Sequence, residues 1–265
     1  MQPTTAGDAN GDIAIDALGE RLVRITINRA HKHNALARPV LRALAGAMKA
    51  AGGNPQTHCV LISGAGDKYF AAGGDLVDLA AVRSPAETGA MVDEATAALD
   101  AIRSCPVPVV AYLNGDALGG GAELAVACDM RLFAPHSRIG FIHGRIGITS
   151  AWGGGTDLCA LVGPARAMRM MSRCEMVDAG WALRWGLADA IVRDGPSGND
   201  AQDFLQPLLG LSTTVLHGIK AQTAALRRGD SHAARRKIER THLVATWASV
   251  EHWTAVDRFL NRDDD

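Results

Sequence analysis

The stretch "ALGGGAELAVACD", residues 117–129, places three consecutive glycines and a glutamate directly before an apolar run of helix-forming residues. Glycine is costly to order, so a triplet indicates that the backbone must come close to another group. That group is either a neighbouring strand or a ligand. A second glycine-rich segment, "GAGDKYFAAGGD" at 64–75, also lies between a predicted strand and a predicted helix. Either segment alone favours tight packing, whereas two of them in one core make a ligand site a competitive interpretation.

The segments around these glycines predict an α/β fold. Alternating apolar residues predict a hairpin over 12–28, and apolar periodicity predicts helices over 37–53 and 86–103. Further strands are predicted over 59–64, 107–115, 129–135 and 138–143, which gives a strand-strand-helix rhythm. From Pro164 the pattern is mostly helical, broken at 187–192, and 231–261 is a long amphipathic stretch. We therefore expect an α/β core over 12–195 and a C-terminal helical region over 196–265.

Composition and charge argue against several classes of protein. The 265 residues suit one core with an appended element, and the net charge of -1 argues against a nucleic-acid partner or an anionic membrane surface. No apolar run approaches the length of a membrane span, and the first residues lack the pattern of a signal peptide. The five cysteines are scattered and never form CxxC, which favours reduced thiols in a cytoplasmic protein and argues against a metal site.

Neither glycine segment matches a phosphate-binding motif. The triplet ends in Ala122-Glu123 where a P-loop needs Gly-Lys-Ser/Thr, and Tyr69 stands where a dinucleotide fingerprint needs its third glycine. Backbone N–H groups at such junctions can instead form an oxyanion hole, which stabilises charge developing on a carbonyl oxygen. Glu123 falls in the first turn of the predicted helix, where the helix dipole stabilises an acid. Its apolar neighbours also suit a desolvated carboxyl group that transfers protons.

The segments "GDALGGGAELAVACDMRL" (115–132), "YFAAGGDL" (69–76) and "HKHNAL" (31–36) together resemble the crotonase superfamily, also called the enoyl-CoA hydratase/isomerase family. The resemblance implies a crotonase-type spiral of β-β-α turns, a C-terminal helical region that forms trimers or hexamers, and an acyl-CoA substrate with no separate cofactor. By position, the N–H groups of Ala72 and Gly120 would form the oxyanion hole. The residues that the resemblance places along the CoA and acyl sites are Ala35, Leu36, Gly74, Asp75, Leu76, Gly119 and Trp152.

The chain departs from the hydratases of this family at His143. Hydratases carry two glutamates, of which the first matches Glu123 and the second falls in "FIHGRIG" (141–147), where this chain has no acid. The stretch "FIHGRIGITSAWGGGTDL" (141–158) most resembles the ethylmalonyl-CoA decarboxylase branch. That resemblance implies decarboxylation of a short alkylmalonyl-CoA, with His143 orienting the carboxylate or protonating the enolate. Two alternatives stay open: an enoyl-CoA hydratase or isomerase of fatty-acid metabolism that uses Glu123 with His143, and a non-catalytic acyl-CoA-binding protein. His143 is also open to reading as an ordinary core histidine.

Overall fold

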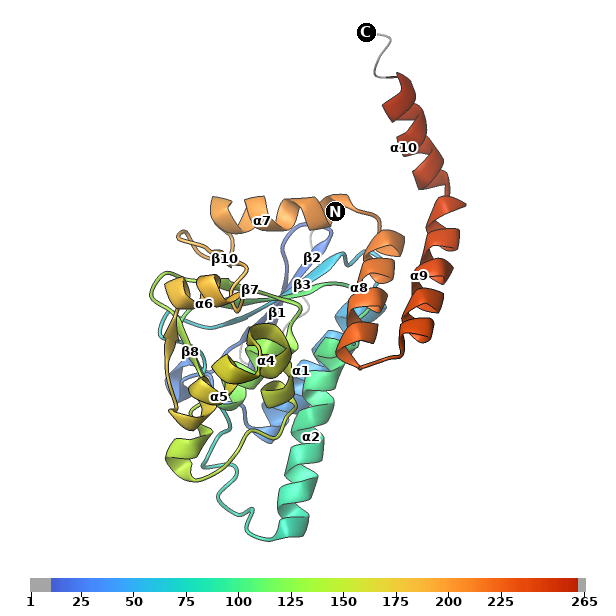
Figure 1. The fold of residues 1–265 in the computed structure, drawn as a ribbon. Coiled ribbons are helices and arrows are strands. Elements are labelled where there is room, and N and C mark those ends of the chain that lie inside the picture. Colours follow the sequence, from blue (N-terminus) through green and yellow to red (C-terminus); the bar gives the residue numbers. More distant parts are fainter. Residues whose placement is uncertain (1–10, 262–265) are drawn as a thin grey trace.

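The computed structural model describes residues 11–261 (Figure 1). Four successive segments each place two strands before a helix, as the sequence rhythm predicts. Their elements are β1 (Ile13–Ala17), β2 (Leu22–Ile27) and α1 (Arg38–Gly53); β3 (Cys59–Gly64), β4 (Tyr69–Ala71) and α2 (Pro85–Arg103); β5 (Val109–Leu113), β6 (Asp116–Leu118) and α3 (Gly120–Ala127); and β7 (Met130–Phe133), β8 (Arg138–Gly140) and α4 (Gly154–Val162). The predicted α/β class is therefore confirmed.

The two strands of a segment separate into different sheets. The larger sheet has the order β1-β2-β3-β5-β7-β10, with β10 at Ala190–Ile191, and the smaller has the order β4-β6-β8-β9, with β9 at Val177–Asp178. Strands β2, β3, β5, β7 and β10 run parallel to one another, while β1 pairs antiparallel with β2. From the second segment to the fourth, the chain therefore adds one strand to each sheet per turn, and this advance produces a spiral.

The central strands β3 and β5 of the larger sheet are buried along their whole length, which is typical of parallel strands covered on both faces. In β3, Val60 and Ile62 belong to the main core with α1 and α2, whereas Cys59 and Leu61 belong to a second cluster with α7 (Asn199–Gly210). Side chains alternate between the faces of a strand, so a run of consecutive apolar residues serves both clusters. This rigid sheet positions the glycine segments that follow β3 and β5.

The remaining helices are α5 (Pro164–Ser172), α6 (Ala179–Trp185), α8 (Thr213–Arg227), α9 (His232–Trp247) and α10 (Val250–Leu260). The long pattern over 231–261 is divided into two helices, because Ser249 accepts a hydrogen bond from the His252 N–H and starts α10. Figure 1 shows α10 pointing away from the core. Neither α9 nor α10 contains a buried residue, and their exposed apolar side chains are Leu243, Val244, Trp247, Val250, Trp253, Phe259 and Leu260.

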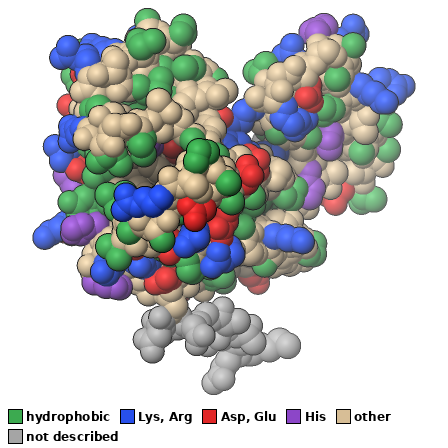
Figure 2. All heavy atoms as spheres, turned by 90° about the horizontal axis from the view of Figure 1, so that it is seen from below, with side chains coloured by type: hydrophobic (Ala, Val, Ile, Leu, Met, Phe, Trp, Pro, Cys, Tyr) green, Lys and Arg blue, Asp and Glu red, His purple; other side chains and the backbone are tan. Residues whose placement is uncertain are grey.

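The surface carries charges of both signs. On the face shown in Figure 2, basic and acidic side chains are interspersed among apolar ones. This distribution agrees with the near-zero net charge of the chain. No helix within residues 11–261 is long and apolar enough to cross a membrane.

Candidate active site

A cavity of about 740 Å³ lies at the amino-terminal end of α3. Its wall is mostly apolar and combines the segment after β4, the start of α3, residues from α2 and the 142–152 segment. The lining residues are Ala72, Gly73, Gly74, Leu76, Leu79, Thr88, Met91, Val92, Gly119, Gly120, Glu123, Ile142, His143, Arg145, Ile146, Gly147, Ile148, Thr149, Ala151 and Trp152. A mostly apolar wall with a few convergent polar groups is the usual form of a small-molecule site.

Glu123 is the most constrained polar side chain of the cavity. It lies in the first turn of α3 and is only 1% exposed. Its Oε2 accepts hydrogen bonds from the backbone N–H groups of Trp152 and Gly154, both at 2.9 Å. Its Oε1 lies 3.1 Å from Nε2 of His143, in the turn His143–Ile146. The fold thus brings the two predicted catalytic side chains into direct contact, with one carboxylate oxygen fixed by amides and the other facing the histidine.

The glycine triplet serves both packing and the cavity. A Cβ on Gly121 would lie 2.0 Å from the carbonyl oxygen of Ala71, so this glycine lets α3 pack against β4. A Cβ on Gly120 would lie 2.3 Å from Cζ3 of Trp152. Gly119 has a φ of 52°, which favours glycine, and it faces the His143 ring. Gly121 thus serves packing against a strand, whereas Gly119 and Gly120 line the cavity.

The backbone amides at the cavity differ from the prediction at one position. Gly120 is the first residue of α3, so its N–H has no acceptor within the helix. The N–H of Ala72 donates to the carbonyl oxygen of His33 at 3.1 Å. The Ala72 amide is already engaged by the backbone, and its predicted role in the oxyanion hole does not fit this structure.

Gly74, and not Ala72, has a backbone N–H that points away from the neighbouring segment. The N–H of Leu36 donates to the carbonyl oxygen of Gly73 at 2.8 Å, and the N–H of Asp75 donates to that of Leu36 at 3.3 Å. Backbone groups of successive residues in an extended segment point to opposite sides, so the Gly74 N–H points away from Leu36. A Cβ on neighbouring Gly73 would lie 3.3 Å from the Gly120 nitrogen, which shows how closely the two segments approach.

Of the predicted lining residues, Gly74, Leu76, Gly119 and Trp152 contact the cavity. Ala35, Leu36 and Asp75 are not among the described residues that line it. The carbonyl oxygen of Ala35 accepts a hydrogen bond from Nη1 of Arg29 at 2.6 Å, and Leu36 is 1% exposed.

Asp75 braces the segment that carries Gly74. Its Oδ1 accepts hydrogen bonds from the N–H groups of Val77 and Asp78, and its Oδ2 lies 3.1 Å from Nη1 of Arg29. Burial opposes ionisation of this carboxyl, but the hydrogen bonds from Arg29, Asp78 and Val77 outweigh it and hold the Asp75 pKa below its usual range. Asp75 is thus a structural carboxylate.

The sequence analysis did not single out Arg145 or Gly154. Arg145 lines the cavity, and its Nη2 donates to the carbonyl oxygen of Cys174 at 3.0 Å. Its position two residues after His143 was the signal from which Arg145 could have been predicted. The role of Gly154 has no such signal, because every residue type except proline has a backbone N–H.

The thiols lie outside this chemistry. All five cysteines are unpaired, and burial raises the pKa of the Cys128 thiol to about 12, reinforced by the nearby Asp129 carboxylate. Within residues 11–261, no group of three or more His, Cys, Asp or Glu side chains is placed to hold a metal ion.

Comparison with known proteins identifies the family. The model of the enoyl-CoA hydratase/isomerase family matches residues 18–265. The chain belongs to the enoyl-CoA hydratase/isomerase family. The fold agrees: a crystal structure of enoyl-CoA hydratase from Bacillus anthracis superposes with a TM-score of 0.88 over 95% of this chain and 97% of that one, at 23% identity. The crotonase fold is thereby confirmed.

Family members of different activity are similar to this chain. Crotonyl-CoA hydratase from Syntrophomonas wolfei is 35% identical over 177 residues, which cover 66% of each chain. Ethylmalonyl-CoA decarboxylase from Xenopus laevis is 33% identical over 156 residues, 58% of this chain and 52% of that protein. The matches span about half to two thirds of the length of these relatives. Because these relatives are named for different reactions, the comparison does not choose between hydration and decarboxylation.

Proposed function

We propose that this family member decarboxylates a short alkylmalonyl-CoA, such as ethylmalonyl-CoA or methylmalonyl-CoA. The observation that carries the proposal is the composition of the cavity wall. Among the described residues that line it, Glu123 is the single acidic side chain, and the group opposite it is His143, at 3.1 Å. Hydration by two carboxylates would need a second acid on this wall.

The proposed oxyanion hole consists of the N–H groups of Gly74 and Gly120. A thioester oxygen between them would lie at the amino terminus of α3, where the helix dipole favours negative charge. Preorganised donors in a site that excludes water stabilise developing charge strongly. In the reaction, the bond between Cα and the carboxylate carbon breaks, its electron pair forms the enolate, and CO₂ leaves. A proton then adds to Cα.

His143 and Arg145 are the groups proposed to receive the substrate carboxylate. A free carboxylate at Glu123 would repel a second one in a dry site. In this structure the Glu123 carboxylate already accepts hydrogen bonds from two amides and contacts His143, which reduces its effect on an arriving anion. His143 is placed to orient the carboxylate or to deliver the proton, and Arg145 adds the only Lys or Arg side chain of the described cavity wall.

The second candidate is an enoyl-CoA hydratase or isomerase. The similarity to crotonyl-CoA hydratase favours it, as does the buried carboxylate of Glu123, which is suited to act as a general base. A non-catalytic acyl-CoA-binding protein is the third candidate, although binding alone would not require Glu123.

The assembly and setting of the enzyme are also proposals. We propose a homotrimer, or a hexamer of two trimers, formed through the exposed apolar faces of α9 and α10. The proposed reaction needs no cofactor, because coenzyme A enters as part of the substrate. A cytoplasmic location is proposed from the scattered, unpaired cysteines.

The deciding experiment incubates the purified protein with ethylmalonyl-, methylmalonyl- and crotonyl-CoA and follows the products by mass spectrometry. We expect butyryl- or propionyl-CoA from the malonyl thioesters, and no such product with Glu123→Gln if Glu123 and His143 act together. Formation of 3-hydroxybutyryl-CoA alone would favour the hydratase. Tight binding of all three thioesters without turnover would favour the binding protein.

A further inference from the structure

The loop 152–154 determines where the Glu123 carboxylate lies. Both amides that hold Oε2 come from this loop, from Trp152 and Gly154. A Cβ on Gly154 would lie 2.5 Å from Cβ of Glu123, and a Cβ on Gly153 would lie 2.8 Å from Nη2 of Arg103. Gly153 also has a φ of 86°, which favours glycine. The loop is therefore packed between Glu123 on one side and Arg103 on the other.

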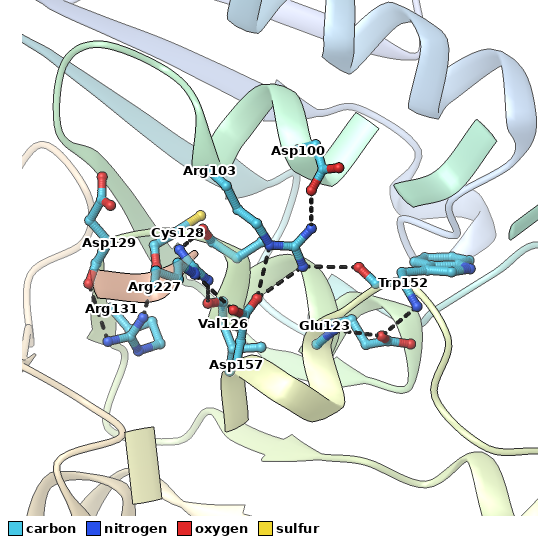
Figure 3. A network of polar contacts seen from close by, with 12 residues as sticks. Asp100, Arg103, Glu123, Val126, Cys128, Asp129, Arg131, Trp152, Asp157 and Arg227 are labelled. Atoms are coloured by element: carbon cyan, nitrogen blue, oxygen red, sulfur yellow. Dashed lines mark hydrogen bonds and ion pairs between the residues drawn. The ribbon is translucent and has the colours of Figure 1, made fainter. Parts of the chain in front are cut away.

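Arg103, at the end of α2, fixes the outer side of this loop (Figure 3). Its Nη2 donates to the carbonyl oxygen of Trp152 at 2.9 Å. Its Nε and Nη2 donate to Oδ2 of Asp157 at 3.0 and 2.9 Å. Nη1 donates to Oδ1 of Asp100 at 2.8 Å. The guanidinium is planar with a rigid set of donors, so these carboxylates fix the direction from which it reaches Trp152.

We infer that Arg103, which lies outside the catalytic cavity, is a positioning residue that orients the Glu123 carboxylate through the Trp152 carbonyl group. The inference rests on the proposed function of Glu123. The carbonyl group that Arg103 holds and the N–H that Glu123 accepts belong to the same residue. Loss of the Arg103 contact frees Trp152 to rotate. That rotation displaces the Trp152 N–H, which donates to Oε2 of Glu123. A displacement of about 1 Å in a catalytic group is enough to lower a rate about 100-fold.

Arg227 provides a matched control within the same network. Its Nε donates to Oδ1 of Asp157 at 2.7 Å, and its Nη1 donates to the carbonyl oxygen of Ala127 at 2.8 Å. The two arginines thus share Asp157, and Figure 3 shows them on the two sides of its carboxylate. Of these two arginines, Arg103 donates to the loop 152–154 and Arg227 does not, so the two variants separate stabilisation of the fold from positioning of Glu123.

The test compares Arg103→Met with Arg227→Met, measuring kcat, KM and Tm with the CoA thioester that the wild type turns over fastest. We expect Arg103→Met to lower kcat at least tenfold while KM stays within threefold. Arg227→Met should lower Tm by a similar amount but leave kcat within twofold of wild type. An unchanged kcat in folded Arg103→Met, or an equal loss of kcat in both variants, would overturn the inference.

Chemical rescue gives a second readout that general damage to the fold would not produce. A cavity of about 490 Å³ outside the active site is lined by Arg103, Gly153, Asp157 and Arg227, and it gives small cations access to the Arg103 position. Millimolar guanidinium should raise the kcat of Arg103→Ala at least threefold, whereas equal concentrations of NaCl should not. Absence of rescue would count against the inference. The catalytic role of Glu123 fails separately, if Glu123→Gln retains full turnover, and the proposed decarboxylation fails if the wild type releases no CO₂ from the malonyl thioesters.

Discussion

Replacing Glu123 with glutamine removes the acid while retaining almost all of its geometry. The amide oxygen of Gln can accept both hydrogen bonds now received by Oε2, from the N–H groups of Trp152 and Gly154 at 2.9 Å. The amide NH₂ then occupies the position of Oε1, 3.1 Å from Nε2 of His143, and can donate to that nitrogen. The variant therefore keeps three polar contacts and the same side-chain volume.

The expected effects on stability and rate are of different size. Neutral hydrogen bonds stabilise the fold less than the charge-assisted bonds that they replace, but burying a neutral amide costs less free energy than burying a carboxylate. Because these two effects oppose each other, the free energy of unfolding should change by about 1 kcal/mol or less. Loss of a group that transfers or directs a proton typically lowers kcat by about 10²–10⁴, which corresponds to about 2.7–5.4 kcal/mol of activation free energy.

The assay is steady-state turnover of the best thioester substrate, with thermal unfolding measured on the same preparations. Glu175→Gln is the control, because Glu175 pairs with Arg169 outside the cavity and should leave kcat unchanged. A Glu123→Gln enzyme with wild-type Tm and kcat within threefold of wild type would refute the catalytic role of Glu123.

Three further predictions concern the oxyanion hole, the brace behind it and the assembly. Gly120→Ala should lower kcat/KM at least tenfold, because its Cβ would lie 2.3 Å from the Trp152 ring and must displace it; kinetics within twofold of wild type would contradict this contact. Asp75→Asn should lower the free energy of unfolding by about 1–3 kcal/mol at pH 7. The Asp75 pKa is lower in the folded state than in the unfolded state, where it is about 3.9. The ionised carboxylate therefore contributes to the free energy of unfolding above about pH 3.9, and this contribution is lost as pH falls through the folded pKa. Urea titrations at pH 7 and pH 3 should show the difference between the proteins shrinking at pH 3, and a constant difference would disprove the assignment. Light scattering should give a mass of three or six chains at micromolar concentration and a smaller species for Trp253→Glu, since Trp253 lies on the exposed face of α10; a monomeric wild type would count against the trimer.

The repeating order of strands and helices was predictable because long elements carry clear periodicity. The helix predicted over 37–53 is α1, and the strand predicted over 59–64 is β3. In the smaller sheet β8 was predicted, but β4, β6 and β9 were not, since they have only two or three residues each and lie in segments rich in glycine or without apolar alternation. Strands this short are specified by their partners in space, which the sequence pattern does not contain.

In the site, reactive side chains could be predicted, whereas the directions of backbone groups could not. Glu123 could be predicted from its apolar neighbours and His143 from the family resemblance, and the structure places them in contact. The prediction for Ala72 failed because the direction of an N–H depends on hydrogen bonds made elsewhere, here to the His33 carbonyl oxygen. The role of Arg103 was equally inaccessible, since it lies 49 residues from the Trp152 carbonyl group that it contacts.

The most direct test of the account is the ratio of kcat/KM for ethylmalonyl-CoA to kcat/KM for crotonyl-CoA, measured for the wild type and for His143→Glu. Within residues 11–261, the cavity wall has one acid facing one histidine, so the wild type should favour the malonyl thioester. A second carboxylate at position 143 would repel the substrate carboxylate in a desolvated site, and the ratio should fall at least 100-fold. A wild type that hydrates crotonyl-CoA efficiently and releases no CO₂ from ethylmalonyl-CoA would contradict the account.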